Sequence, residues 1–149
     1  MVEVFPRCRS QEVPEDFEEV LRSGWSGVFD FLGQVGVGVI AGFEDLEISL
    51  LDDDEMARVH GEFLNDETTT DVITFAHGEI LVGVEVAVRQ AGEFGTRPDR
   101  EVALYGIHGM LHLSGFDDGN PDEARKMVRK QEELLEAFFG DLFRSRRFF

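Results

Sequence analysis

The segment from Pro98 to Leu113 constrains the fold of this chain most, because the helix that it predicts is apolar on most of its sides. Proline fits the first turn of a helix, and Gly115 provides a residue at which the helix can end, since glycine readily adopts the left-handed conformation found there. A helix that is apolar nearly all round has to be covered nearly all round. We therefore expect this helix at the centre of the fold, packed against a sheet.

Two histidines lie on this predicted helix, His108 and His112, and the chain contains only four histidines. A spacing of four residues puts both imidazoles on one face, one turn apart, so that they can point at one metal ion. Asp117 and Asp118 follow the turn at Gly115, where a third ligand would have to come from. Two histidines, one carboxylate and an open position for water form a ligand set used by catalytic zinc and by non-haem iron. The alternative is an ordinary pair of helix histidines, one buried and hydrogen-bonded and the other solvated.

Gly109 distinguishes this run from the motif of zinc peptidases. In that motif, His-Glu-x-x-His, the glutamate after the first histidine serves as the general base. Glycine stands in its place here. A peptide-hydrolysing enzyme would therefore need an acid from elsewhere in the chain.

Composition favours a folded protein of one domain. The chain has 149 residues, 42% of them hydrophobic, and its 14 phenylalanines can supply much of the buried area. It contains no apolar run long enough to span a membrane and no signal-peptide pattern at its N-terminus. Cys8 is the only cysteine, so an intrachain disulfide is excluded. We expect a cytoplasmic protein with no membrane partner.

The formal net charge is −17, from 31 acidic and 14 basic residues. Such a surface repels nucleic acid at long range and argues against a general nucleic-acid binder. It does not exclude a nuclease whose metal ion and local basic groups attract a phosphate. Arg58, Arg89, Arg97 and Arg100 could form such a basic groove, although solvated charges on helix faces are the more common role of such residues.

Hydrophobic periodicity predicts strands alternating with helices. Strands are expected at 2–7 (an edge strand), 46–51, 72–75 (a buried strand) and 79–82. Helices are expected at 14–32, 52–64, 87–94, 98–113 and 120–138. The remaining segments are a loop or short strand at 33–42, a polar loop at 65–69 and a frayed basic tail at 144–149. We expect an α/β (α+β) fold of a single domain, with a mixed central sheet of about four strands packed with about five helices and a metal site on a central helix.

The run from His108 to Asp118 resembles the signature of the YbeY family, bacterial single-domain metal-dependent endoribonucleases. The family signature reads His-Gly-x-Leu-His-Leu-x-Gly-Tyr-Asp-His, and this chain matches it up to Asp117, with Phe116 at the tyrosine position. Upstream, Thr-Asp-Val-Ile-Thr-Phe at 70–75 is similar to the family's Thr-Asp-Val-Leu-Ser-Phe, and Gly-Glu-Ile at 78–80 is similar to its Gly-Asp-Ile. The resemblance covers roughly residues 46–138.

Two positions depart from the family pattern. The third histidine of the signature, a zinc ligand in the family, is Asp118 here. A carboxylate also binds zinc but makes the site harder and more anionic, which broadens the choice of metal toward iron or manganese. Asp117 could ligate instead, and the sequence leaves that choice open. The family arginine before the Thr-Asp-Val strand is replaced by Leu64, with Arg58 as a candidate substitute.

The resemblance implies one YbeY-like metalloendoribonuclease domain over residues 1–149, with His108, His112 and Asp118 as metal-binding and catalytic residues. The metal would be one Zn²⁺ per chain, or another divalent ion. The implied function is cleavage of single-stranded RNA in rRNA maturation, at the 16S rRNA 3′ end, and in ribosome quality control, with the ribosome or its small subunit as partner. Two alternatives remain: a metal-dependent hydrolase of peptides or amides, and a non-catalytic ribosome-associated maturation factor whose zinc is structural.

Overall fold

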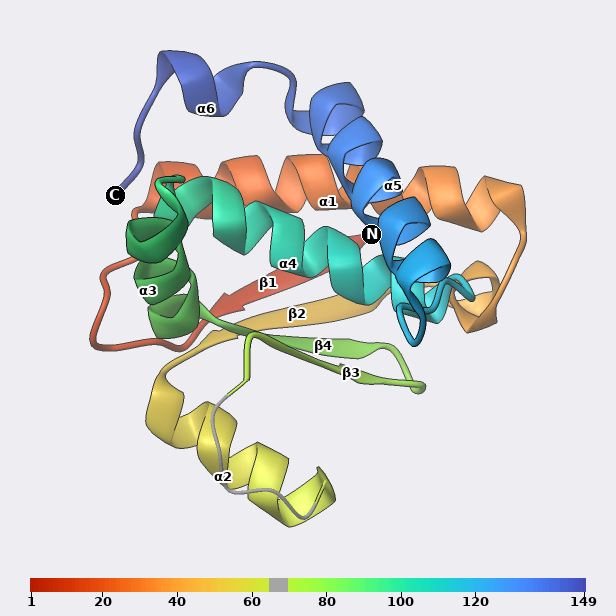
Figure 1. The fold of residues 1–149 in the computed structure, drawn as a ribbon, viewed down its shortest axis with the longest axis horizontal. Coiled ribbons are helices and arrows are strands. Elements are labelled where there is room, and N and C mark those ends of the chain that lie inside the picture. The colour runs from red at the N-terminus through yellow and green to blue at the C-terminus, as the bar shows by residue number, and fades with distance from the viewer. Residues whose placement is uncertain (65–69) are drawn as a thin grey trace.

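Short runs of valine, leucine and isoleucine form strands that pair into one mixed sheet, in the order β1-β2-β4-β3 (Figure 1). The computed structural model describes residues 1–64 and 70–149. The strands in this part of the chain are β1 (Val2–Pro6), β2 (Leu46–Leu51), β3 (Val72–Phe75) and β4 (Glu79–Gly83). The helices are α1 (Glu15–Val35), α2 (Asp53–Leu64), α3 (Val84–Phe94), α4 (Pro98–Leu113), α5 (Pro121–Phe139), the short α6 (Leu142–Ser145) and the 3₁₀ helix η1 (Val39–Gly42). The predicted α/β class with a mixed sheet is confirmed.

Parallel pairing organises most of the sheet. β1 pairs with β2 and β2 with β4 in parallel, so that Val4, Ile48 and Ile80 lie side by side, all of them buried. β3 pairs with β4 antiparallel at the edge of the sheet. Only Ile73 is fully buried in β3, so the prediction of a buried strand at 72–75 is wrong. An edge strand has a neighbouring strand on one side only, so it is less buried than a central strand. The short apolar run at 72–75 did not distinguish an edge strand from a central one.

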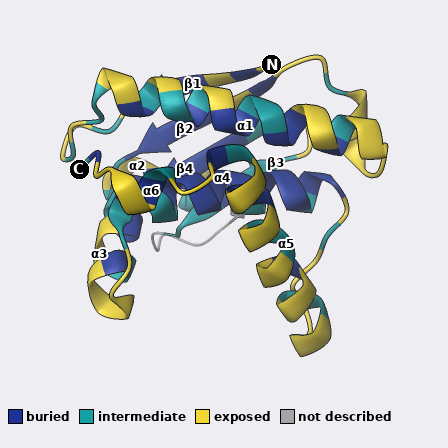
Figure 2. Ribbon diagram, turned by 90° about the horizontal axis from the view of Figure 1, so that it is seen from above, coloured by how far each residue is buried: buried dark blue, intermediate teal, exposed yellow. Residues whose placement is uncertain are grey.

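Helices cover both faces of the sheet. α1 and α4 lie across one face, α2 lies on the opposite face, and α5 packs on α4 and α1 farther from the sheet (Figure 1). Buried residues concentrate in the sheet and in α4, whereas much of α5 is exposed (Figure 2). Eleven of the sixteen residues of α4 are buried, which confirms the prediction of a central helix. None of the described helices combines the length and the apolar character that crossing a membrane requires.

Two glycines let α4 approach its neighbours closely. A Cβ at Gly106 would lie 2.3 Å from the indole of Trp25, which donates a hydrogen bond from Nε1 to the carbonyl of Ala103 at 3.0 Å. A Cβ at Gly109 would lie 2.9 Å from Ile80 of β4 and 3.0 Å from Thr74 of β3. Because side chains would not fit here, α4 is held against α1 on one side and against the sheet on the other.

The boundaries of several elements differ from those predicted from the hydrophobic periodicity. β4 runs directly into α3, which begins at Val84 rather than at the expected residue 87. α1 continues to Val35 and ends at Gly36, whose φ is +78°. η1 follows, where a loop or a short strand was expected. The predicted polar loop at 65–69 lies outside the described residues.

The C-terminal segment packs against the core. The ring of Phe148 is buried, with its centroid 5.0 Å from that of Phe17. The backbone N–H of Phe148 donates to the buried carboxylate of Asp99 at 2.9 Å, and Arg146 forms an ion pair with Asp16. The prediction of a frayed terminus is therefore wrong. The prediction failed because the two phenylalanines that end the tail supply apolar area although they do not continue a helical pattern of apolar residues.

Candidate metal centre

His108 and His112 lie one turn apart near the C-terminal end of α4, and their rings meet. Their Nε2 atoms are 3.0 Å apart, and the ring planes are inclined at 81°. The two side chains are 22% and 29% exposed, so that a ligand can reach them from solvent. The helical spacing of the sequence therefore brings both imidazoles to one accessible point.

The chain turns back after α4 and carries Asp118 to the same point. Gly115 has a φ of +95°, a conformation that glycine adopts without strain, and the backbone N–H of Phe116 donates back to a carbonyl of α4. The Oδ2 atom of Asp118 lies 3.6 Å from Nε2 of His108 and 3.8 Å from Nε2 of His112. The reversal expected at Gly115 is present.

These three atoms form a triangle of the size that a metal ion requires. All of the potential ligand atoms lie within 4.8 Å of one another. A point equidistant from the two Nε2 atoms and the Oδ2 atom lies about 2.0 Å from each, as the three separations dictate, and zinc–nitrogen and zinc–oxygen bonds have lengths of about 2.0–2.2 Å. The residues present therefore fit a divalent ion with three protein ligands.

Asp117 has a different place in the loop. Its Oδ1 atom accepts the backbone N–H of Asp118 at 2.8 Å, and its side chain is exposed. It does not join the cluster that His108 and His112 form with Asp118. The geometry thus favours Asp118 over Asp117 as the third ligand, with Asp117 ordering the loop that carries it.

Hydrogen bonds at the far side of each ring orient the imidazoles. The Nδ1 atom of His112 lies 3.2 Å from the carbonyl oxygen of Phe116, which can only accept, so this nitrogen carries the proton. The Nδ1 atom of His108 lies 2.7 Å from Oε1 of Gln131 on α5. With both Nδ1 atoms as donors, the Nε2 atoms are the unprotonated nitrogens of the two rings and lie 3.0 Å apart, an arrangement that a cation between them stabilises. Sequence reasoning missed Gln131, although a polar residue between Met127 and Leu134 interrupts an apolar helix face.

The position after His108 has no room for a general base. The Cβ of any residue at 109 would lie within 3.0 Å of Ile80 and Thr74 in the sheet. A glutamate there would have to displace the side chains of both residues. The glycine that separates this chain from the peptidase motif is therefore fixed by packing.

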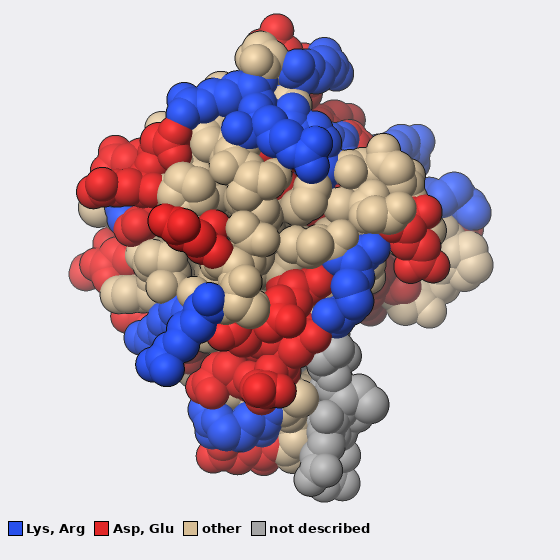
Figure 3. Space-filling view, turned by 90° about the vertical axis from the view of Figure 1, so that its left-hand side faces the viewer, with Lys and Arg blue, Asp and Glu red and all other residues tan. Residues whose placement is uncertain are grey.

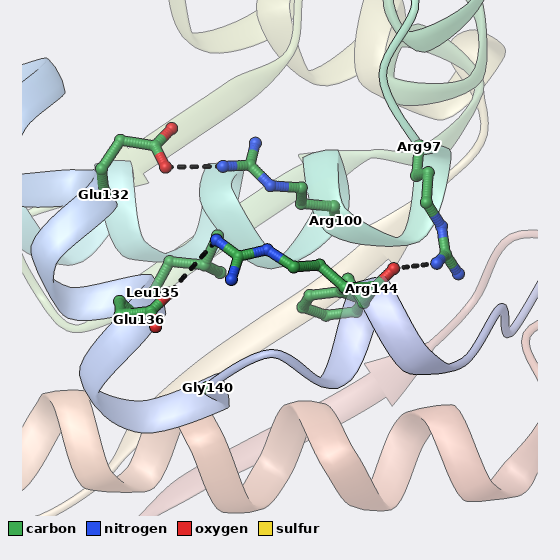
Figure 4. Close-up of a pocket in the computed structure, with 8 residues that line it drawn as sticks. Arg97, Arg100, Glu132, Leu135, Glu136, Gly140 and Arg144 are labelled. Carbon is green, nitrogen blue, oxygen red and sulfur yellow. Dashed lines mark hydrogen bonds and ion pairs between the residues drawn. The ribbon is translucent and has the colours of Figure 1, made fainter.

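The four arginines considered for a basic groove do not form one. Arg58 and Arg89 lie on α2 and α3, where Glu55 and Glu62 pair with the first and Asp53 with the second. Arg97 and Arg100 line a pocket of about 290 Å³ with Arg144 (Figure 4). The ion-pair partners of these three arginines are Asp99, Glu132 and Glu136, respectively. Their role as paired surface charges agrees better with the structure than a groove does.

Acidic and basic side chains both occur on the face drawn in Figure 3, with uncharged surface between them. Lys and Arg gather at the top, Asp and Glu are most extensive at the left edge and in the lower centre, and smaller groups of Lys and Arg also lie in the lower half. This distribution agrees with the net charge of −17.

The candidate substitute for the family arginine lies away from the metal centre. Arg58 belongs to α2, which covers the sheet face opposite α4 (Figure 1). Its guanidinium bridges Glu55 and Glu62 on the exposed side of that helix. From this position it does not supply the missing charge beside His108 and His112.

Burial raises the pKa values of two side chains outside the metal centre, Cys8 and Tyr105, and neither is reactive as a result. Burial, helped by the charge of Asp52, raises the pKa of the Cys8 thiol to about 11, so the only cysteine stays protonated near neutral pH. Burial and then the charge of Glu101 raise the pKa of Tyr105 above its ordinary value. The phenol stays neutral and donates to Oε1 of Gln90 at 2.6 Å.

The small α/β fold and the helix-borne pair of imidazoles beside a loop carboxylate define a class, that of metal-dependent hydrolases with an accessible three-ligand site. The sequence profile of the family described as Endoribonuclease YbeY matches residues 26–139. The chain belongs to the endoribonuclease YbeY family. The family predicted from the histidine run is thereby confirmed, and with it the prediction of an enzyme.

Individual relatives agree with this assignment. Endoribonuclease YbeY of Pelotomaculum thermopropionicum is 34% identical over 110 residues, which cover 62% of this chain and 72% of the relative. Endoribonuclease YbeY of Bacillus cereus strain AH187 is 28% identical over 149 residues, covering 87% of this chain and 91% of the relative. The solution structure of a Thermotoga maritima protein is similar in fold, with a TM-score of 0.65 at 22% identity over 95% of this chain and 91% of that one.

Proposed function

We propose that this chain is a metal-dependent endoribonuclease that cleaves single-stranded RNA in rRNA maturation, at the 16S rRNA 3′ end, and in ribosome quality control. The observation that carries the proposal is the distance of at most 4.8 Å between the ligand atoms of His108, His112 and Asp118, in a chain of the endoribonuclease YbeY family. The ribosome or its small subunit is the proposed partner, and the cytoplasm the proposed location.

The proposed metal is one Zn²⁺ per chain, held by Nε2 of His108, Nε2 of His112 and a carboxylate oxygen of Asp118. A bound divalent ion with an open position polarises a phosphate oxygen and makes water more acidic. The anionic Asp118 lowers the net charge of the site relative to three neutral histidines, and iron or manganese remain alternatives to zinc for that reason.

The protein residues supply orientation and access. The carbonyl of Phe116 holds His112 with its Nε2 lone pair toward the site, and Asp117 orders the loop that presents Asp118. The side chain of Asp118 is 46% exposed, so the open side of the site faces solvent and a flexible single strand can reach it. His108, His112 and Asp118 are the proposed catalytic residues because they surround the position of the reacting phosphate.

The two alternatives receive less support. A peptide hydrolase of the His-Glu-x-x-His type needs a carboxylate at position 109, and packing against Ile80 and Thr74 leaves no space for one. A structural zinc usually has four protein ligands rich in cysteine, whereas this cluster offers three without any cysteine. An accessible three-ligand site is typical of catalysis.

Metal content provides the first test. We expect about one zinc per chain in the purified protein by elemental mass spectrometry, a loss or strong weakening of binding in Asp118→Ala, and retention in the matched control Asp117→Ala. Single-stranded RNA should be cleaved, casein should not, and a chelator should abolish cleavage. Absence of metal from the wild type, even after reconstitution, would remove the catalytic proposal. Equal loss in both aspartate variants would contradict the assignment of Asp118.

A further inference from the structure

Gln131 is the one glutamine whose side chain reaches the candidate metal centre among the described residues. It lies on α5, and its Oε1 atom is 2.7 Å from Nδ1 of His108, on the side of the ring away from Asp118. The side chain is half-buried between α5 and α4. The contact joins residues that are 23 positions apart in the sequence, so packing of the two helices creates it.

The surroundings of Gln131 make an amide unexpected at this position. Residues three and four apart on a helix share a face, and three of these four neighbours, Met127, Leu134 and Leu135, are buried, while the fourth, Val128, is exposed. A leucine at 131 would continue this apolar face toward α4. A half-buried amide costs desolvation free energy unless a hydrogen bond compensates for it, and the described partner is His108. The polar group therefore points to a role at the imidazole rather than in helix packing.

His112 provides the comparison within the same site. The backbone carbonyl of Phe116 receives its Nδ1–H, and this support exists whatever side chain stands at 116. His108 lies one turn farther from the helix end than His112, where the backbone carbonyls are used by the helix, so its ring needs a side-chain acceptor. Gln131 is that acceptor.

We propose that Gln131 is a positioning residue of the metal centre. Its Oε1 atom accepts the Nδ1–H of His108, which keeps the Nε2 lone pair of that ring directed toward Nε2 of His112 and Oδ2 of Asp118. The proposal rests on the metal centre of the proposed function. Gln131 acts through His108 and touches neither metal nor RNA.

Zinc affinity, measured by competition with a chromophoric chelator, tests this role without RNA. We expect Gln131→Leu to weaken zinc binding by about 10- to 100-fold, the usual effect of losing an outer hydrogen bond to a ligating histidine. Gln131→Glu keeps an acceptor and should bind at least as tightly as the wild type. The matched control is Gln90→Leu, which removes the hydrogen bond between Gln90 and Tyr105 of α4 without touching either histidine. It should leave zinc affinity unchanged.

Nitrogen-15 NMR of the zinc-loaded protein separates positioning from general destabilisation. The Nδ1 proton of His108 should be protected from solvent exchange in the wild type and should exchange rapidly in Gln131→Leu. The Nδ1 proton of His112, held by the Phe116 carbonyl, should stay protected in both and serves as the internal reference.

Two outcomes would overturn the inference. The first is zinc affinity of Gln131→Leu within about twofold of the wild type, and the second is equal protection of the His108 proton in the two proteins. Absence of zinc binding by the wild type would instead overturn the metal centre itself, and this inference with it. None of these measurements uses RNA. An error in the proposed substrate would therefore appear only in the cleavage assay and would leave the test of Gln131 unaffected.

Discussion

Two imidazoles meet at one point only if the helix that carries them is held in a fixed position, and Gly109 sets that position. Its missing side chain brings α4 against Ile80 and Thr74, at the turn that bears His108. At about 100° per residue, Gly109 lies beside the helix face that carries His108 and His112, so this contact adjoins the candidate metal centre. A single residue without a side chain thus controls the distance of the candidate ligands from the sheet.

Replacement of Gly109 by alanine tests this packing. We expect Gly109→Ala to lower the free energy of unfolding by about 1–2 kcal/mol, because the overpacking cost of ~1–3 kcal/mol exceeds the gain in helix propensity. Gly33→Ala is the control, since Gly33 also lies in a helix but has no atom within 4 Å of its added Cβ. It should raise the free energy of unfolding by about 0.5–1 kcal/mol. Urea denaturation of apo proteins measures both, and a shift of the same sign in the two would contradict the argument.

At the residue scale, the sequence was sufficient to predict which side chains lie together wherever the spacing was local, while their role as metal ligands stays a prediction. His108, His112 and Asp118 lie within eleven consecutive residues, and helical spacing plus a glycine turn was enough to bring them together. The choice between the two aspartates depended on the loop conformation, which the sequence did not determine. Gln131 reaches His108 only because α5 folds back on α4, and no local pattern encodes that contact.

At the scale of elements, the end of α4 is fixed by the segment that precedes η1. Gly38, with a φ of +80°, brings its backbone so close that a Cβ would lie 2.4 Å from the carbonyl of Leu113. The hydroxyl of Ser114 donates to the carbonyl of Val37 at 3.3 Å. These contacts hold the helix end from which the loop to Asp118 departs.

Elements with strong periodicity or clear capping signals were predicted well, and the others were not. Asn120 accepts the backbone N–H of Glu123 at 2.9 Å at the start of α5, as its sequence indicated. η1 and the edge character of β3 depend on which segments lie beside them. The tail was misjudged because Phe148 packs on Phe17, more than a hundred residues away in the sequence.

Truncation of Phe148 measures how much this tail contributes. We expect Phe148→Ala to lower the free energy of unfolding by about 2–4 kcal/mol, because a buried ring in contact with Phe17 is lost. Phe94→Ala, at a ring that is 69% exposed, should change it by less than about 0.5 kcal/mol. Thermal and urea denaturation provide the comparison. Equal effects of the two substitutions would mean that the tail does not contribute to the core in solution.

At the scale of the whole molecule, the net charge of −17 opposes the approach of a polyanion. The four arginines considered for a basic groove are paired with carboxylates, as the pocket of Figure 4 illustrates for Arg100 and Glu132. Repulsion between like charges is screened by salt, and the Debye length falls from ~30 Å at about 0.01 M to ~10 Å at about 0.1 M. Salt should therefore assist the encounter with RNA.

The ratio kcat/KM for cleavage of a long single-stranded RNA tests this expectation. We expect it to rise roughly two- to tenfold between about 0.01 M and 0.1 M potassium chloride at constant zinc. A short oligonucleotide with few phosphates serves as the control and should respond less. A steep fall with salt, as is usual for proteins that bind nucleic acid through many cations, would contradict the repulsion argument and indicate a basic surface formed on binding.

The tight contact at Gly109 also limits which enzymes can evolve from this chain. Conversion of His-Gly-x-x-His to the peptidase motif His-Glu-x-x-His requires only one substitution. The glutamate side chain would, however, overlap with Ile80 and Thr74. A lineage would first have to repack these two side chains and tolerate the loss of stability on the way. A single substitution at 109 therefore carries a packing cost before it can supply a general base, and a compensating change at Ile80 or Thr74 would have to precede it in evolution.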